Sequence, residues 1–405
     1  MSRIDDLIRD LCPDGVEFRA LEEIFETRNG YTPSKNDPEA WSGNDIPWFR
    51  MDDIRSHGRI LRDATQRISI SAVKGSKTFP ADSILVATSA TIGEHALVRV
   101  PHLSNQRFTN LAIKDNFKNS FDIRFLFYYC FKLDAWCLKN TTTSNFPSVD
   151  MKGFKKFKFP IPPLEVQQEV ARILDQFTQL EAELETELEA RQHQYTYYRD
   201  ILVAPQNSSQ LVKLGAISRI ARGASPRPIR QFITDSTGVP WIKIGDVPPG
   251  GKHITSTAQH ISEDGATRSR RIKPGDFILS NSMSFGRPFI SKIDGCIHDG
   301  WLMISDYEKT FDQDFLYHVL RSSPIQKDFT QRAGSGTVRN LNSTIVGETL
   351  VPAPPIDQQR DIVDLLDKFD LLVNDLTSGL PAEIEARRKQ YEYYRDRLLT
   401  FPEKK

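Results

Sequence analysis

The amino-acid sequence predicts an α+β protein in which two pseudo-symmetric mixed α/β units are separated by a pair of long antiparallel coiled-coil helices. Three observations lead to this fold class: the second half of the 405-residue chain repeats the first, each half ends in a long apolar seam with helical spacing, and the segment before each seam alternates short β-rich runs with turns. At about 150 residues per domain, the length suggests two or three domains.

The repeat is clearest in the helical segments. The segment that begins at Pro162 matches the one that begins at Pro354, and the block from Arg191 to Asp200 matches the block from Arg387 to Asp396. The regions before them match more loosely but in the same order. These weaker matches are Gly30-Tyr-Thr-Pro33 with Gly223-Ala-Ser-Pro226, and Ile46-Pro-Trp48 with Val239-Pro-Trp241. Similar helices with divergent globular parts indicate one shared partner for the helices and two different ligands for the globular units.

The two apolar seams predict long helices. The first runs from Ile173 to Leu202 at steps of three and four, and the double proline at 162–163 is expected at its entrance, because proline is tolerated only in a first turn. This leaves about 40 residues, or about 60 Å of helix. The second seam runs from Ile362 through Leu376 to Leu398. Gly379 and Pro381 interrupt it, so we expect a kink or short break near 378–381.

Each globular unit is expected to contain short strands and one amphipathic helix. The expected helices cover 121–139 and 311–321, and the expected strands include 46–50, 83–88, 239–244 and 276–280. The segment from Lys152 to Phe159 interleaves lysines with phenylalanines, a pattern found in nucleic-acid-binding proteins. Because it lies directly before the helix, an edge strand with inward-facing phenylalanines is the preferred interpretation.

Composition excludes several classes of protein. The 53 basic and 53 acidic residues cancel, so any basic face must be local. The four cysteines form no C-x-x-C pair, which argues against a disulfide scaffold or a structural zinc site and fits a reducing compartment. The charged N-terminus does not resemble a signal peptide, and no apolar run is long enough to span a membrane. We therefore expect a cytoplasmic protein with no membrane association.

Side chains suited to DNA contacts gather in loops and strand edges. Arginine pairs with guanine, asparagine and glutamine pair with adenine, serine and threonine pair with either, and glycine lets the backbone approach. The predicted DNA-binding residues are Arg50, Arg62, Arg67, Lys74, Ser89, Thr91, Gln106, Arg107, Lys243, Arg268, Arg270, Arg271, Ser282, Ser284, Arg287 and Arg339. Ordinary solvated surface charge remains an alternative for the basic ones.

Two groups of these arginines are expected to act differently. Arg287 and Arg339 lie in Gly/Ser-rich loops where a guanidinium could reach a guanine edge, whereas the charge run of Arg268, Arg270 and Arg271 suits phosphates.

Catalytic motifs are missing from the sequence. The nearest match to a phosphate-binding loop, Gly245 to His253, has its lysine displaced and no Ser or Thr after it. There is no Asn-Pro-Pro-aromatic segment of an adenine methyltransferase, no H-E-x-x-H and no G-x-S-x-G. His298-Asp299 has no neighbouring nucleophile and does not predict a catalytic pair. The sequence therefore predicts no catalytic residue, no metal site and no cofactor.

The arrangement resembles a known family, the specificity subunits of type I restriction-modification systems. The motifs that carry the resemblance are the Pro-Pro helix entrances at 162 and 354, the R-x-x-Q-Y-x-Y-Y-R-D blocks at 191 and 387, and the paired I/V-P-W segments. The tandem Glu181-Ala-Glu-Leu184 and Glu185-Thr-Glu-Leu188 is similar to the four-residue helix repeats of one subclass. The resemblance implies target recognition domains at 1–160 and 205–352 and long spacer helices at 161–204 and 353–405.

The resemblance also implies a function. Each domain would read one half of a bipartite double-stranded DNA target, while the helices would set the spacer and bind two modification subunits. Restriction subunits would join the full complex, and the chain itself would catalyse nothing. The predicted partner-binding residues are Tyr195, Tyr198, Arg199, Tyr391, Tyr394 and Arg395. Alternatives from other classes are a self-contained DNA-modifying or DNA-cleaving enzyme and a coiled-coil scaffold that does not bind DNA.

Overall fold

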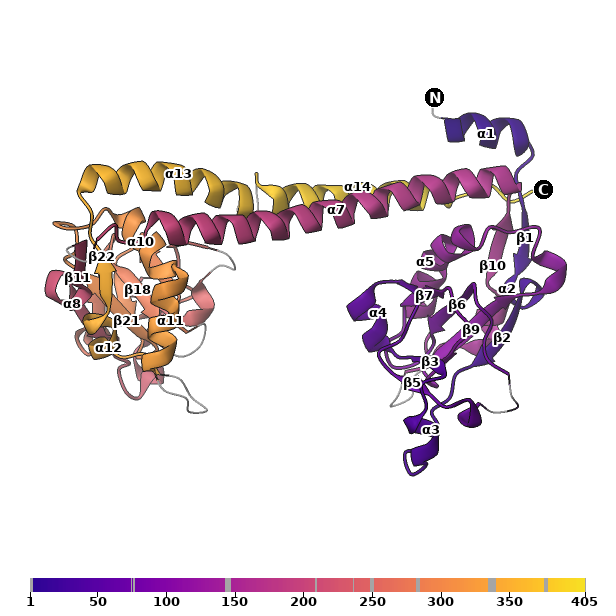
Figure 1. The fold of residues 1–405 in the computed structure, drawn as a ribbon, viewed down its shortest axis with the longest axis horizontal. Coiled ribbons are helices and arrows are strands. Elements are labelled where there is room, and N and C mark those ends of the chain that lie inside the picture. The colour runs from indigo at the N-terminus through magenta and orange to yellow at the C-terminus, as the bar shows by residue number, and fades with distance from the viewer. Residues whose placement is uncertain are drawn as a thin grey trace. The chain divides into compact units, whose positions relative to one another are not determined.

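The structure is a computed structural model, shown in Figure 1, that divides into two compact units. The first unit comprises Met1–Glu181 with Arg387–Lys405, and the second comprises Ala182–Ala386. The residues that the structure describes are 3–73, 75, 77–142, 147–207, 210–235, 237–247, 251–281, 285–333, 340–374 and 378–404.

Two sheets and one strand pair form the β-structure of the first unit. The larger sheet has the order β2-β9-β6-β7-β4, and the smaller sheet has the order β5-β3-β8. The strands β1 and β10 pair separately and antiparallel. The bounds are β1 Glu17–Ala20, β2 Phe25–Asn29, β3 Ile46–Phe49, β4 Ile60–Leu61, β5 Arg67–Ile68, β6 Ser83–Ala87, β7 His95–Val98, β8 Leu103–Ser104, β9 Phe108–Ile113 and β10 Lys158–Ile161.

Helix α5 supplies much of the core of the first unit. Asp122 caps its first turn by accepting a hydrogen bond from the backbone of Arg124, and one face of the helix is fully buried in the same apolar cluster as strands of the larger sheet. Phe159 of β10 and Phe154 are also buried there, as expected, but the expected edge strand over Lys152–Phe159 is wrong for most of its length: Asp150 caps a short helix at 151–156, and the strand begins only at Lys158. The helices are α1 Arg3–Leu11, α2 Leu21–Ile24, α3 Pro38–Ser42, α4 Met51–His57, α5 Ile123–Lys139 and α6 Met151–Lys156, with short 3-10 turns at Ile70–Ala72 and Asp115–Phe117.

The second unit repeats the topology of the first. Its larger sheet has the order β12-β21-β18-β19-β15, which matches the first unit strand for strand, and its smaller sheet has the order β13-β16-β14-β20-β17. The strands β11 and β22 pair as β1 and β10 do. The bounds are β11 Leu211–Lys213, β12 Arg219–Arg222, β13 Ile233–Thr234, β14 Val239–Ile242, β15 His253–Ile254, β16 Gln259–Ile261, β17 Arg270–Ile272, β18 Phe277–Ser280, β19 Pro288–Ser291, β20 Gly295–Ile297, β21 Trp301–Ser305 and β22 Leu350–Pro352.

The helices of the second unit also follow the repeat, with differences. A 3-10 turn at Ile244–Asp246 follows β14 where helix α4 follows β3. The helix that corresponds to α5 breaks at Ser322, so that α10 and α11 replace one longer helix, and both are visible beside the sheet in Figure 1. The helices are α8 Leu214–Ile217, α9 Glu263–Thr267, α10 Gln313–Arg321, α11 Ser323–Arg332 and α12 Ser343–Glu348, with 3-10 turns at Ile229–Gln231 and Ile244–Asp246. The helices expected at 121–139 and 311–321 and the strands expected at 46–50, 83–88, 239–244 and 276–280 are therefore confirmed within two residues at each end.

The long helices begin and end close to the expected residues. Helix α7 runs without interruption over Leu164–Leu202, directly after the double proline. The second seam forms two helices, α13 over Ile356–Asn374 and α14 over Leu380–Leu398. Pro381 lies in the first turn of α14, where proline is tolerated, so it starts this helix rather than interrupting it. Leu376, which the seam included, lies outside the described residues.

Each unit pairs part of α7 with one of the shorter helices. In the first unit, Phe177 stacks on Tyr394 with ring centroids 5.6 Å apart, and Glu181 accepts a hydrogen bond from Arg388 at 2.6 Å. The residue numbers run in opposite directions, so the two helices are antiparallel. In the second unit, Tyr198 stacks on Phe369 at 5.9 Å. The repeat makes Phe369 the counterpart of Phe177 and Tyr198 the counterpart of Tyr394, so both units use the same pair with the roles of the helices exchanged.

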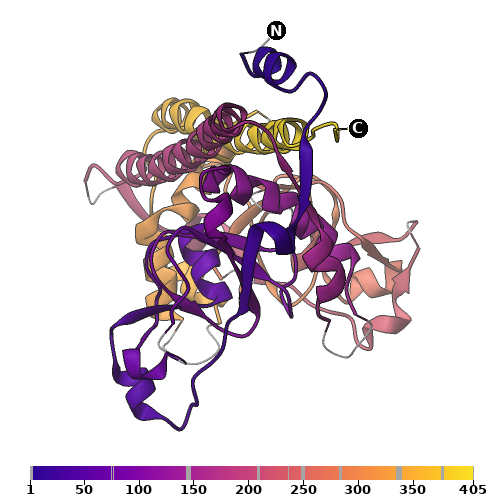
Figure 2. The same cartoon turned by 90° about the vertical axis from the view of Figure 1, so that its right-hand side faces the viewer.

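The two ends of the chain meet in the first unit. The backbone N–H of Val16 donates to the carbonyl of Pro402 at 2.9 Å, and that of Lys404 donates to the carbonyl of Val16 at 2.8 Å. Figure 2 shows the yellow C-terminal segment beside the indigo N-terminal strand. The four cysteines are free and buried. In the described part of the chain, no helix has the length and apolar character needed to cross a bilayer.

A buried glutamine ties each long helix to its globular unit. The side-chain amide of Gln167 donates to the carbonyls of Ser120 and Pro162, both at 2.8 Å, and its oxygen accepts from the backbone of Asp122 at 2.9 Å. Gln359 makes the equivalent three hydrogen bonds in the second unit. Neither side chain is exposed. One amide thereby pairs three backbone groups that water cannot reach.

We predict that Gln167→Ala destabilises the first unit by about 2 to 5 kcal/mol, because it leaves these three buried backbone groups without partners. Gln168→Ala is the matched control, since Gln168 is exposed on the same turn of α7. Thermal and urea unfolding of the two variants measure the difference. Equal stability of both variants would contradict the structural role of Gln167.

Candidate functional site

The smaller sheet of each unit contains one pair of parallel strands whose carboxyl ends meet at one edge. In the first unit β3 and β8 are paired through Trp48 with Leu103 and Phe49 with Ser104. In the second unit β14 and β20 are paired in the same way. Residues that follow adjacent parallel strands lie together, and this edge is where α/β sheets commonly bind ligands. We call the turns that follow β8 and β20, residues 105–108 and 298–301, the edge turns.

A dense set of backbone contacts holds the first edge turn. The N–H of Gly30 donates to the carbonyl of Phe108 at 2.9 Å, and the N–H of Tyr31 donates to the carbonyl of Ser104 at 2.8 Å. The Oδ1 atom of Asn105 accepts from the backbone N–H of Arg107 at 3.0 Å. A Cβ atom on Gly30 would lie 2.1 Å from the carbonyl oxygen of Asn105, so only glycine fits at this position.

The second edge turn has the same backbone frame. The N–H of Gly223 donates to the carbonyl of Trp301 at 2.8 Å, and that of Ala224 donates to the carbonyl of Ile297 at 3.2 Å. The Nδ1 atom of His298 takes the place of the asparagine oxygen and accepts from the N–H of Gly300 at 2.7 Å. A Cβ atom on Gly223 would lie 2.0 Å from the carbonyl oxygen of His298. The recurring Gly-x-Thr/Ser-Pro motif therefore begins with glycine because the edge turn passes against it.

The hydroxyl in that motif holds the side chain at the tip of each turn. In the first unit, Thr32 donates to Oε1 of Gln106. In the second unit, Ser225 donates to Oδ1 of Asp299 at 2.8 Å. This hydrogen bond is the main reason that the pKa of Asp299 lies below the usual value, so the carboxylate is ionised at neutral pH. Gln106 is exposed, and the side chain of Asp299 is 44% exposed.

A cation follows the other parallel strand in each unit. Arg50 follows β3, and the carboxylate of Asp53 accepts from its backbone N–H at 2.7 Å. Lys243 follows β14, and Asp246 accepts from its backbone at the same distance. The guanidinium of Arg50 lies over the ring of Trp48, with its carbon atom 5.8 Å from the ring centroid. The structure thus brings the predicted residues Arg50, Gln106 and Arg107 to one edge, and it brings Lys243 to the equivalent edge.

Of the other predicted residues of the first unit, Ser89 lies next to the first edge turn, because the N–H of the preceding Thr88 donates to the carbonyl of Arg107 at 2.9 Å, whereas Arg67 serves the fold. Arg67 donates to the carbonyls of Asn44 and Asp45 and pairs with Asp63 at 2.6 Å, so its guanidinium is already occupied. Arg62 is exposed, and Ser89 and Thr91 are half-buried in the loop after β6. Lys74 lies outside the described residues.

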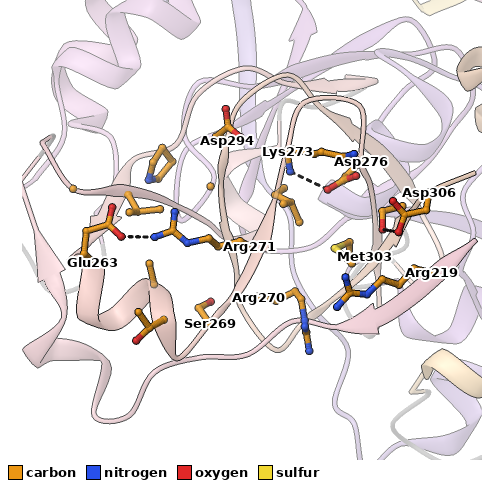
Figure 3. A pocket seen from close by; sticks show the side chains of 18 of the residues that line it. Arg219, Glu263, Ser269, Arg270, Arg271, Lys273, Asp276, Asp294, Met303 and Asp306 are labelled. Carbon is orange, nitrogen blue, oxygen red and sulfur yellow. Dashed lines mark hydrogen bonds and ion pairs between the residues drawn. The ribbon is translucent and has the colours of Figure 1, made fainter. Parts of the chain in front are cut away.

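Arg270 and Arg271 of the basic run line a pocket of about 810 Å³ in the second unit, drawn in Figure 3, whereas Arg268 does not line it. Arg271 points toward Glu263 and pairs with it, and Arg268 pairs with Asp264 at 3.2 Å. Arg270 donates to the carbonyl of Arg222 at 3.3 Å. Four acidic residues line this pocket beside its four basic ones. These acidic residues offset part of the positive charge of the run. Its role in phosphate binding stays a prediction.

Arg287 is held within the second unit. Its guanidinium lies over the ring of Phe289 at 4.9 Å and donates to the carbonyl of Gly251 at 3.5 Å. Arg339, Ser282 and Ser284 lie outside the described residues, so the proposed difference between the two groups of arginines stays a prediction.

The tyrosines and arginines of the two helical blocks are buried to different extents. Tyr195 is only 2% exposed and Arg199 only 6%, because Tyr195 packs in the second core and Arg199 lies over its ring. Tyr391 and Arg395 are half-buried in the same arrangement. Of the predicted partner-binding residues, Tyr198 and Tyr394 are the most exposed, and they also stack on phenylalanines. Direct contact of the buried members with a partner stays a prediction.

Two exposed tyrosines were not among the predicted residues. Tyr197 and Tyr393 occupy equivalent positions in the two blocks, and each is 62% exposed. The seam periodicity could have found them, because in each block they lie one residue away from Tyr198 or Tyr394 and therefore off the apolar seam.

Comparison with known proteins identifies the family. The sequence profile described as "Type I restriction modification DNA specificity domain" matches residues 13–190 and again 207–386. The chain belongs to this family. It is 40% identical over 379 residues to the EcoprrI specificity subunit of Escherichia coli, covering 89% of each chain. It is 28% identical over 401 residues to the EcoR124I/EcoR124II specificity subunit of Escherichia coli, covering 89% of this chain and 95% of the relative. As a member of this family of specificity subunits, the chain is non-catalytic.

Solved structures support the same fold. One solved structure concerns complex assembly and conformational transition of the type I R-M system. A chain in it superposes on this chain with a TM-score of 0.69 at 16% identity, and the match covers 96% of this chain and 98% of that one. The HsdS subunit from Thermoanaerobacter tengcongensis gives a TM-score of 0.53 at 16% identity and covers 96% of each chain. Among the residues that the structure describes, no group of three or more His, Cys, Asp or Glu could hold a metal ion.

A buried histidine that precedes the first edge turn, His102, is expected to make the stability of the first unit depend on pH. His102 precedes β8, packs edge-on against Phe49 and Phe79, and lies 2.9 Å through Nδ1 from the carbonyl of Val100. Burial lowers its pKa from 6.5 to about 4. Between these two values the unfolded chain binds a proton that the folded chain does not bind. The stability of the first unit should therefore fall as the pH decreases through this window.

We predict that His102 contributes about 3 kcal/mol to the loss of stability between pH 6.5 and pH 4. Urea unfolding of the wild type and His102→Gln across this range measures the contribution: the variant should be less stable at pH 7 but should show the flatter profile. His57→Gln, at an exposed position on α4, is the control. Parallel profiles for wild type and His102→Gln would contradict the prediction.

Proposed function

We propose that the chain is the DNA-reading subunit of a type I restriction-modification complex, and that each globular unit reads one half of a bipartite double-stranded DNA target. The observation that carries this proposal is the pair of edge turns. They share one backbone frame but present different side chains, Gln106 and Arg107 in the first unit and Asp299 in the second. A common frame with different tips suits a duplicated reader of two different sequences.

The chemistry of the edge suits a duplex. Exposed amide, carboxylate and guanidinium groups are the groups that read base edges in the major groove. The cations that follow the neighbouring strands, Arg50 and Lys243, suit the phosphates that flank those bases. Both kinds of contact come from residues that directly follow strands of the smaller sheet, and a sheet is a scaffold that can keep the reading groups in register with the DNA.

The helical blocks suit two copies of one partner. The blocks have nearly the same sequence, and the most exposed tyrosine of each, Tyr197 or Tyr393, is exposed to the same extent. Tyrosine is enriched in the parts of interfaces that carry binding energy. We propose that these surfaces bind two modification subunits, with restriction subunits joining the complete complex. The curated relatives, named as specificity subunits of restriction enzymes, support this assembly.

We further propose that α7 acts as a ruler between the two half-sites. Deletion of Glu185–Leu188 removes about 6 Å of helix and leaves the apolar seam roughly in register. Because one base pair spans about 3.4 Å, the preferred spacer should shorten by at least one base pair while both half-sites stay unchanged. Sequencing the sites that the complex methylates measures the spacer directly.

The control for this deletion replaces the same four residues with alanines and so keeps the length of α7. This variant should retain the wild-type spacer. An active deletion complex with an unchanged spacer would rule out the ruler, and a wild-type complex that methylates no bipartite site would rule out the proposed function itself.

We predict that Arg50→Ala and Lys243→Ala each weaken binding to all DNA sequences and lower the slope of log affinity against log salt by about one. Arg67→Ala should leave the slope unchanged, because Arg67 is occupied by Asp63 and two backbone carbonyls. Salt-titrated binding of the full-length chain to a duplex measures these slopes. A slope change for Arg67→Ala as large as for Arg50→Ala would contradict the assignment.

A further inference from the structure

We propose that the two edge turns are the base-discriminating elements of their units, and that Asp299 is the second unit's counterpart of Gln106 and reads the exocyclic amine of a cytosine. The inference rests on the proposed function and adds the residues and the base. Asp299 was not among the residues expected from the sequence to contact DNA.

The equivalence of the two positions rests on several independent contacts. In each unit a glycine N–H binds the last carbonyl of the turn, and the next N–H binds the last residue of the parallel strand. In each unit the first side chain of the turn accepts from the N–H two residues later. In each unit the hydroxyl of the Gly-x-Thr/Ser-Pro motif binds the second side chain, Gln106 or Asp299. These contacts leave no ambiguity of register between the two turns.

The three residues at the tip of each edge turn, 105–107 and 298–300, differ at every position. The first turn presents Asn105, Gln106 and Arg107, and the second presents His298, Asp299 and Gly300. The residues that build the frame are kept, because glycine and a hydroxyl occur in both units. Packing alone does not require exposed tip residues to differ in this way. A turn that keeps its frame and changes its tip is suited to select between ligands.

The chemistry of the first tip favours purines. A glutamine amide carries a donor and an acceptor and pairs with N6 and N7 of adenine, whereas arginine pairs with O6 and N7 of guanine. Gln106 and Arg107 are both exposed. Thr32 fixes the amide orientation of Gln106 by donating to its oxygen, which leaves the amide N–H groups to act as donors.

The chemistry of the second tip favours a base with an exocyclic amine. An ionised carboxylate only accepts hydrogen bonds, and the major-groove amine donors are N4 of cytosine and N6 of adenine. N4 of cytosine suits a carboxylate better, because N6 of adenine lies beside the acceptor N7 of the same base. Ser225 holds Oδ1 of Asp299 at 2.8 Å. The Oδ2 atom lies 3.7 Å from the guanidinium of Arg227, whose side chain is 84% exposed. Asp299 is therefore oriented by the protein and still accessible.

His298 serves as a positioning residue for this carboxylate. Its ring lies between Trp241 and Trp301, with centroids 6.3 and 6.1 Å away, and its Nδ1 atom accepts from Gly300. Because Nδ1 is an acceptor, the neutral ring carries its proton on Nε2. The ring therefore helps to hold the turn without adding charge to the edge.

The test is selection of bound duplexes from a randomised library by the full-length chain in complex with modification subunits. Asp299→Asn keeps the acceptor for Ser225 and converts the second oxygen into an amide donor. We expect one position of one half-site to change from cytosine to adenine, with about a 10- to 100-fold loss for the original base. The other half-site and the spacer should stay the same.

The matched control is Asp294→Asn. Asp294 precedes β20, whereas Asp299 follows it, so the same change of charge is made at the opposite end of one strand, on the wall of the pocket in Figure 3. This variant should select the wild-type sequence. A second variant, His298→Asn with Asp299→Gln and Gly300→Arg, gives the second edge turn the side chains of the first. It should introduce purine preferences into the second half-site.

The outcomes separate this inference from the proposed function. If the wild-type complex selects no bipartite sequence, the proposed function fails. If it does select one, and Asp299→Asn and the transplanted turn both bind DNA with that sequence unchanged, the proposed function stands and the edge turns are not the reading elements. If both half-sites change with Asp299→Asn, the assignment of Asp299 to one half-site is overturned.

Discussion

The structure depends on how a long helix is attached to a globular unit without leaving backbone groups unpaired. Gln167 and Gln359 solve this problem by placing one amide among three backbone groups at the helix entrance. Because the amide is buried, each lost hydrogen bond would leave a polar group that water cannot reach. The position and direction of the first turn of each long helix follow from this attachment. The stacked pairs Phe177 with Tyr394 and Tyr198 with Phe369 then extend the helix packing within each unit.

The second theme is the separation of frame and tip at the carboxyl edge of the parallel strands. Gly30 and Gly223 bring two backbone segments into close contact, and Asp53 and Asp246 cap the residues that follow β3 and β14. These contacts are made by backbone groups and by a few small or acidic side chains, so they do not constrain the exposed residues beside them. A duplicated unit can therefore diverge at its tips while its fold stays the same.

The sequence predicted the fold well because apolar periodicity and the repeat are local signals. The entrance of α7 after Pro163 and the break before α14 both followed from spacing and from proline, and Pro381 lies in the first turn of α14. The site was predicted less completely. Gln106 and Asp299 are equivalent in space but differ in chemistry, so the repeat alone did not connect them. The role of Arg67 depends on carbonyls that are distant in sequence, and no local sequence pattern predicts such a contact.

The division of the second seam into α13 and α14 has a consequence for how the chain folds. Helix α14 packs with the first unit and α13 with the second. Each unit therefore contains the shorter helix that pairs with its own part of α7. A substitution in α14 is expected to change the stability of the first unit, and a substitution in α13 that of the second. We therefore expect the chain to unfold as two cooperative units that share one continuous helix, α7.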